Sequence, residues 1–110
     1  MGLFTYMRKP WLRRNYKSVT FKMSVSYILH HLGKYDLDKV YRSNDWQDAK
    51  EKKVLSWLDA GKNPFSIPPI RIVLHAQREE FRVEDGISRL RAFRKKGISS
   101  IYANVRVGEW

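Results

Sequence analysis

The stretch "VEDGISRLRAFRKKG", residues 83–97, decides the fold expected for this chain. It begins like the end of a β-strand, passes through Gly86 and continues as a helical segment in which Ile87, Leu90 and Phe93 recur every third residue. Glycine permits the sharp turn that such a passage needs, because it lacks a Cβ atom. The pattern therefore predicts a strand, a tight turn and a helix in direct succession.

The segments on either side of this stretch complete a mixed pattern of strands and helices. "PPIRIVL" and "EFRVED" before it predict two paired strands, and "SIYANVRV" after it alternates like a half-buried final strand. Three further elements are expected upstream: a short strand in "YKSVTFK", a helix capped by Ser24 and ended by Gly33, and a helix with Asp45 as N-cap and Gly61 at its C-terminal end. Prolines in "KNPFSIPPI" predict a rigid connector. The fold class indicated is α/β (α+β), with helices packed on a small mixed sheet.

Length and composition favour a single domain. The chain has 110 residues, of which 43% are hydrophobic, so one core is expected at residues 16–110 behind a basic, aromatic arm at residues 1–15. No cysteine is present, which excludes disulfides and thiolate chemistry. No apolar run approaches the length of a membrane span, so a cytoplasmic protein without a membrane partner is expected, and its oligomeric state stays open.

The charge of the chain favours a polyanionic partner. The formal net charge is +11, and the N-terminal segment carries cations among aromatic residues without any acid. Cations neutralise phosphates and aromatic faces stack on bases, so nucleic acid is the expected partner, with DNA preferred to RNA. The arm residues expected to contact it are Arg8, Lys9, Arg13, Arg14 and Lys17. A non-catalytic protein that docks an acidic partner would show the same charge.

The predicted strand-turn-helix is the candidate phosphate site. The first turn of a helix presents unpaired N–H groups and the positive end of the helix dipole, and Gly86, Ser88 and Arg89 lie in that turn. Ser88 can donate a hydroxyl hydrogen bond and Arg89 a charge-assisted one. The residues expected to extend this positive surface are Arg91, Arg94, Lys95 and Lys96. In the simpler alternative, Asp85 caps the helix and these cations are only solvated.

These motifs, in this order, resemble the ParB/sulfiredoxin-like superfamily, also called ParB-like nuclease domains. The resemblance covers about residues 45–107 and centres on the run from Asp85 to Arg89 in "DGISRLRAF". It implies a ParB-like single domain that places the phosphates of a nucleotide such as ATP or CTP, with Mg²⁺, at this turn. Ile87 stands where relatives carry a reactive cysteine or a glutamate. Isoleucine can neither hold Mg²⁺ nor move a proton, so the resemblance excludes sulfinic acid repair and weakens the case for hydrolysis.

Catalysis is the second hypothesis, and whether the chain is an enzyme stays open. Asp85, together with Glu84, Glu79 and Glu80, would suit a divalent ion in a metal-dependent nuclease or nucleotide-hydrolysing enzyme. His75, at the end of its strand, is a candidate general base. Surface ion pairing is the alternative for these acids. The adjacent His30 and His31 have no further ligands at zinc spacing, so no metal site is predicted.

Overall fold

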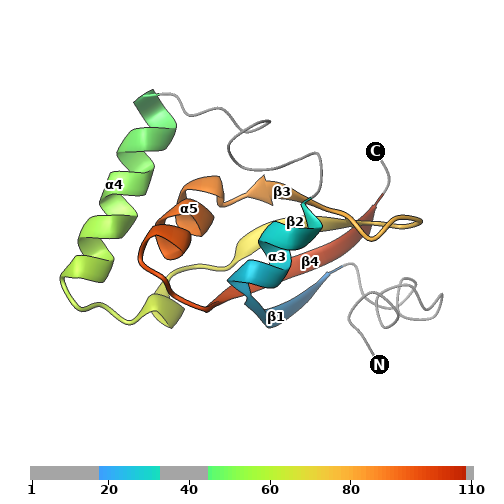
Figure 1. Ribbon diagram of the computed structural model, residues 1–110, viewed down its shortest axis with the longest axis horizontal. Coiled ribbons are helices and arrows are strands. Elements are labelled where there is room, and N and C mark those ends of the chain that lie inside the picture. The colour runs from blue at the N-terminus through green and yellow to red at the C-terminus, as the bar shows by residue number, and fades with distance from the viewer. Residues whose placement is uncertain (1–17, 33–44, 109–110) are drawn as a thin grey trace.

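The protein is a small mixed α/β domain built on one four-stranded sheet, as the sequence predicts (Figure 1). A computed structural model describes residues 18–32 and 45–108, so the predicted arm at residues 1–15 and Gly33 lie outside the described residues. The described elements are β1 (Val19–Ser24), α3 (Val25–His31), α4 (Asp45–Asp59), the 3₁₀ helix η2 (Pro64–Ser66), β2 (Ile70–His75), β3 (Phe81–Asp85), α5 (Ile87–Lys95) and β4 (Ser100–Gly108).

The sheet has the strand order β1-β4-β2-β3. The β1/β4 and β2/β3 pairs are antiparallel, whereas the central β2/β4 pair is parallel. A parallel pair needs a crossover connection, and the β3 return strand with α5 supplies it between β2 and β4. Residues 83–97 therefore carry the chain from one edge of the sheet back toward its middle.

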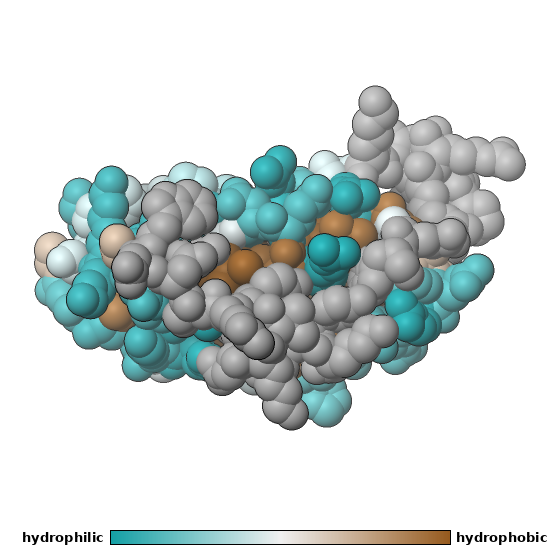
Figure 2. Space-filling view, turned by 90° about the horizontal axis from the view of Figure 1, so that it is seen from above, coloured by the Kyte–Doolittle hydropathy of each residue, from teal (hydrophilic) through white to brown (hydrophobic). Residues whose placement is uncertain are grey.

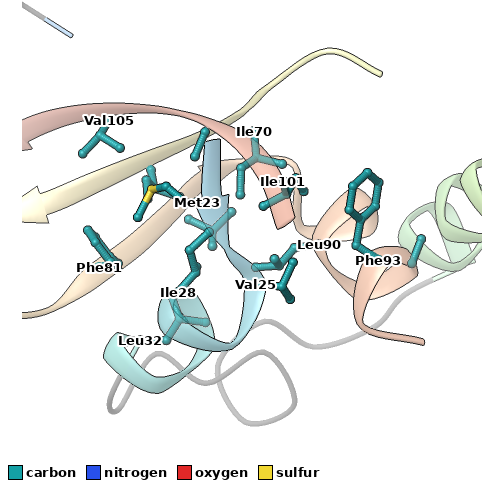
Figure 3. Packing of buried hydrophobic residues seen from close by; sticks show 14 of the residues in the cluster. Met23, Val25, Ile28, Leu32, Ile70, Phe81, Leu90, Phe93, Ile101 and Val105 are labelled. Atoms are coloured by element: carbon teal, nitrogen blue, oxygen red, sulfur yellow. The ribbon is translucent and has the colours of Figure 1, made fainter. Parts of the chain in front are cut away.

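Helices α3 and α5 cover one face of this sheet, and α4 packs against the outer side of α5 (Figure 1). The alternating apolar residues of all four strands point into this interface. Figure 3 shows Val25, Leu90 and Ile101 close together where α3, α5 and β4 meet. The largest fully buried side chains are Phe81, Phe93, Ile28, Leu32, Ile70, Ile72, Leu74, Leu90 and Val105. On the face seen in Figure 2, the described residues are mostly hydrophilic, with hydrophobic residues visible as a narrow central band.

The ends of the helices agree with the predicted signals at two positions and differ at a third. Ser24 caps α3 by accepting a 3.2 Å hydrogen bond from the amide of Tyr27. Gly61 follows α4 with φ +80°, a left-handed conformation that glycine adopts without a steric cost. The prediction of Asp45 as N-cap is wrong by one position, because Asp45 is already the first residue of α4. In β1 the strand runs on to Ser24, since Met23 pairs with Ile101 and is buried.

The connector between α4 and β2 contains a short turn of 3₁₀ helix. Asn63 caps it by accepting a 2.9 Å hydrogen bond from the amide of Phe65, and its own carbonyl accepts a 2.7 Å bond from the hydroxyl of Ser66. The two prolines that follow lead directly into β2. Within the described ranges, none of the helices is both long and apolar enough to cross a membrane.

Candidate functional site: the corner between β3 and α5

Gly86 forms the corner at which β3 turns into α5. Its φ is +109°, and a Cβ atom placed there would lie 2.4 Å from Cγ2 and 2.7 Å from Cβ of Ile70. Ile70 is fully buried at the start of β2, so it has no room to give way. Glycine is thus required both by the left-handed backbone and by the contact with the sheet.

Arg89 fastens this corner to the proline connector. Its Nη1 donates to the carbonyl oxygens of Pro68 at 2.7 Å and Pro69 at 2.9 Å, and its Nη2 donates to Asp85 Oδ2 at 3.0 Å. The side chain is only 17% exposed. The sequence predicts Arg89 as a phosphate ligand, but its planar guanidinium already donates to three acceptors within the fold. We therefore assign Arg89 a structural role at the border of the site.

Asp85 is held between two guanidinium groups. Besides Arg89, the Nε of Arg71 lies 3.9 Å from Asp85 Oδ2, and the carboxylate is half exposed. This arrangement is typical of an ion-pair acceptor and differs from a carboxylate that ligates a metal. In the part of the chain that the structure describes, no three His, Asp or Glu side chains come together as metal ligands.

Glu84 is engaged by Arg106 of β4, which reaches it across β2. Two contacts join them, from Nε to Oε2 at 3.0 Å and from Nη2 to Oε1 at 3.2 Å. The hydrogen bond from Arg106 lowers the pKa of Glu84 below its ordinary value, and the bond to Glu84 raises the pKa of Arg106. Both carboxylates at the end of β3 are thus neutralised by arginines.

The lowered pKa of Glu84 predicts a small loss of stability in acid. A depressed carboxylate pKa stabilises the fold above the unfolded-state value of about 4.3, and this contribution is lost as the pH falls through the folded-state pKa. We expect Glu84→Gln to lower the unfolding temperature by a few degrees at most at pH 7, because the pair is exposed. The difference from the parent should vanish near pH 2. The exposed Glu79 gives the control variant Glu79→Gln, and a gap that persists in acid would contradict the assignment.

A pocket of about 500 Å³ opens between this corner and α4. One wall is the first turn of α5, and the other is a side of α4 that carries Lys50, Lys53 and Trp57. The full lining is Lys50, Lys53, Val54, Trp57, Ile67, Pro68, Glu84, Asp85, Gly86, Ile87, Ser88 and Arg89. The predicted turn residues therefore do border a pocket. Its other wall is α4, a helix that is not predicted as part of the site from the sequence.

Trp57 offers an aromatic face among cations at this pocket. Its side chain is 38% exposed, the highest value among the large hydrophobic residues that the structure describes. The Nζ atoms of Lys53 and Lys62 lie 5.7 Å and 5.3 Å from its ring centroid. Lys50, Lys53 and Trp57 follow the spacing i, i+3, i+7 and so share one side of a helix, a signal by which the sequence could have revealed this wall.

Most of the other predicted cations of α5 are buried or form ion pairs with α4. Because α5 is packed between the sheet and α4, Arg91 is buried with 6% exposure, and its place on the predicted surface is wrong. Lys95 Nζ pairs with Glu51 Oε2 of α4 at 3.0 Å, and Lys96 pairs with Asp59. Arg94 is half-buried, while Ser88 is buried at the pocket. The arm cations Arg8, Lys9, Arg13, Arg14 and Lys17 lie outside the described residues.

His75 lies far from this corner. Gly86 packs on Ile70 at the start of β2, and His75 ends the same strand five residues later, roughly 17 Å away at about 3.3 Å per residue. Its buried Nδ1 accepts from the amides of Gln77 and Arg78, both at 3.1 Å. The prediction of His75 as a general base at the phosphate turn is therefore wrong, and the ring instead organises the β2–β3 turn.

Comparison of the chain with family models, with curated proteins and with solved structures finds no match. The class that fold and site define is thus a small α/β domain with a basic, aromatic pocket at a strand-turn-helix corner. The resemblance to the ParB/sulfiredoxin-like superfamily stays a hypothesis carried by the motif around Gly86.

Proposed function

We propose that this domain binds nucleotides, as free triphosphates or as units of a nucleic acid, in the pocket between α4 and the β3–α5 corner. The observation that carries the proposal is the pairing of one aromatic face with lysines across from a helix N-terminus in a single pocket. A nucleotide has the complementary parts, a flat base and a polyanionic phosphate chain.

The two walls of the pocket divide the recognition between them. The indole of Trp57 would stack on the base, while Lys50 and Lys53 would neutralise phosphate oxygens. The first turn of α5 adds the positive end of its dipole, and Gly86 as N-cap contributes no side chain that would compete for the amides. The volume of about 500 Å³ lies in the range of small-molecule pockets.

The electrostatics of the lining also favour an anion. Glu84 and Asp85 border the pocket, but Arg106 neutralises the first and Arg89 with Arg71 the second. The lining carries three cations, Lys50, Lys53 and Arg89, against these two acids. Asp85 serves the fold as an ion-pair partner, so the proposal is one of binding and includes no hydrolytic step.

Titration of the full chain with ATP and CTP, with and without Mg²⁺, tests the proposal by calorimetry. The double variant Lys50→Ala/Lys53→Ala should weaken binding by about 10-fold or more, since two charge-assisted phosphate contacts are lost. Trp57→Ala should weaken it by about 5-fold or more through lost stacking. Both changes lie on an accessible wall and should leave the free energy of unfolding within about 1 kcal/mol of the parent.

The matched control is Lys52→Ala, which removes one positive charge, as each of the single changes Lys50→Ala and Lys53→Ala does, from an exposed position of α4 that does not border the pocket. If this control loses as much nucleotide affinity as the lysine variants of the pocket, the loss is an effect of net charge alone and the assignment of the pocket is wrong. Failure of ATP, CTP and short oligonucleotides to bind at low salt would instead favour a protein that docks an acidic partner.

A further inference from the structure

The face of the sheet opposite the helices is basic and carries an aromatic pair. Side chains that lie opposite each other in the register share a face, and on this face Lys22 pairs with Tyr102, Thr20 with Asn104, and Asn104 with Arg71. Further along β2, Val73 lies opposite both Arg106 and Arg82. The other face is covered by α3 and α5 (Figure 1). These residues therefore form the outer surface of the same sheet.

Cations predominate on this outer face. Lys22, Arg71, Arg82 and Arg106 are all exposed, the side chain of Arg71 by 60% and that of Arg106 by 47%. Two acids face them: Asp85 lies opposite Arg71, and Glu84 pairs with Arg106. That pair spans β2 above Val73, which explains why Val73 is only 6% exposed. Among the described residues, cations therefore outnumber acids on this face by four to two.

Phe65 and Tyr102 supply aromatic faces at one end of this surface. Phe65 of η2 is 37% exposed, and its ring centroid lies 5.7 Å from that of Tyr102 in an edge-to-face arrangement. Lys22 Nζ lies 4.2 Å from the Phe65 centroid. An exposed phenylalanine and a tyrosine, with cations beside them, present surfaces on which bases stack while neighbouring phosphates are neutralised.

We infer that this outer face of the sheet binds single-stranded nucleic acid, with bases stacked on Tyr102 and Phe65 and the backbone following Lys22, Arg71 and Arg106. Charge complementarity selects this occupant, because four cations face two acids, Glu84 and Asp85, on a surface that also offers rings. From Tyr102 to Arg106, β4 spans about 13 Å, and a four-stranded sheet with surface aromatics can stack about two or three bases. Asn104, which donates to Thr20 at 3.0 Å, lies midway and adds polar groups for base edges.

This inference shares its ligand class with the proposed function but uses different residues. None of Lys22, Arg71, Tyr102 and Arg106 borders the pocket. Arg71 and Arg106 do pair with Asp85 and Glu84, which border it, so the variants of Tyr102 and Lys22 are the ones that separate strand binding across the sheet from mononucleotide binding in the pocket.

Fluorescence anisotropy with labelled ten-nucleotide oligo-U and oligo-dT, on the full chain, tests the inference. Tyr102→Leu keeps an apolar side chain beside Phe65 but removes the aromatic face, and should weaken binding by about 5- to 20-fold, whereas Tyr102→Phe should retain it. Lys22→Glu should weaken binding by about 10-fold at low salt. The double variant Lys22→Ala/Arg71→Ala should make the slope of log K against log salt shallower by about 1.4.

Lys52→Glu on α4 is the matched control, because it changes the net charge by the same amount as Lys22→Glu at a site away from the sheet. Its effect should be less than about 2-fold, and an effect equal to that of Lys22→Glu would overturn the inference. Tighter binding of a duplex than of either single strand would also overturn it. Thermal unfolding of each variant separates lost binding from lost folding.

This experiment distinguishes failure of the pocket proposal from failure of the proposal for the sheet face. If ATP and CTP bind and only the Lys50 and Lys53 variants weaken oligonucleotide binding, the pocket stands and the sheet face is not a site. If oligonucleotides bind with the expected loss in Tyr102→Leu while mononucleotides do not bind, the sheet face stands and the pocket proposal fails. Oligo-U and oligo-dT in parallel show whether RNA or DNA is the preferred strand.

Discussion

Gly86→Ala is expected to lower the free energy of unfolding by about 2 to 5 kcal/mol. An L-residue held in a left-handed conformation costs about 1 to 2 kcal/mol, and forcing extra atoms into a packed interior costs about 1 to 3 kcal/mol more. Both terms apply, because φ is +109° and the new Cβ would lie 2.4 Å from the side chain of Ile70. Since Ile70 is β-branched and fully buried, the strain cannot be relieved by a rotamer change. Denaturant unfolding monitored by tryptophan fluorescence measures the loss.

Gly61→Ala and Gly97→Ala are the matched controls for this prediction. Both positions have positive φ, +80° and +67°, but a Cβ atom there meets nothing within 4 Å. They should therefore show only the backbone cost, about 1 to 2 kcal/mol. If Gly86→Ala destabilises no more than these two, the close approach of the corner to β2 is not a constraint on the fold.

The second large effect is expected at Arg89. Arg89→Ala removes three charge-assisted contacts that join the corner to the connector, and should cost about 2 to 3 kcal/mol of stability. Arg89→Lys should recover only part of this loss, since one ammonium group cannot reproduce the fork that reaches both proline carbonyls. Thermal and denaturant unfolding of the two variants would measure both effects.

Arg71→Ala is the control for Arg89, because it removes the other arginine that faces Asp85. Its Nε lies 3.9 Å from the carboxylate and its side chain is 60% exposed, so the loss should stay below about 1 kcal/mol. One outcome for Arg89→Ala would contradict the structural role that we assign to Arg89. Unchanged stability together with abolished nucleotide binding would make this guanidinium a ligand, as the sequence first indicates.

The sequence predicts the order of elements well because local signals determine it. Alternating apolar residues define β2, β3 and β4, and Ser24 and Gly61 mark helix ends by capping chemistry. The strand order β1-β4-β2-β3 has no such signal, because pairing between distant strands depends on how the whole core packs. The register that places Tyr102 beside Lys22 thus becomes visible only in three dimensions.

The site is predicted less completely than the fold, again for physical reasons. The motif at residues 85–89 correctly indicates a glycine-dependent corner that borders a pocket. The motif cannot show that Arg89 donates hydrogen bonds to two carbonyl oxygens of the connector. Nor can it show that Arg91 is buried between the sheet and α4. A long basic side chain is attributed to the surface by default, and only the packing of α4 on α5 decides otherwise.

The position of β4 in the sheet has a consequence for how the chain reaches its native state. The first described strand and the last lie next to each other, with Val19 opposite Val105. During synthesis β1 can pair with β4 only after nearly all of the 110 residues have left the ribosome. The parallel pairing of β2 also requires β4 and is therefore equally late. Bringing these distant strands together costs chain entropy before their contacts can stabilise the fold. We therefore expect this domain to fold more slowly than a helical domain of equal size.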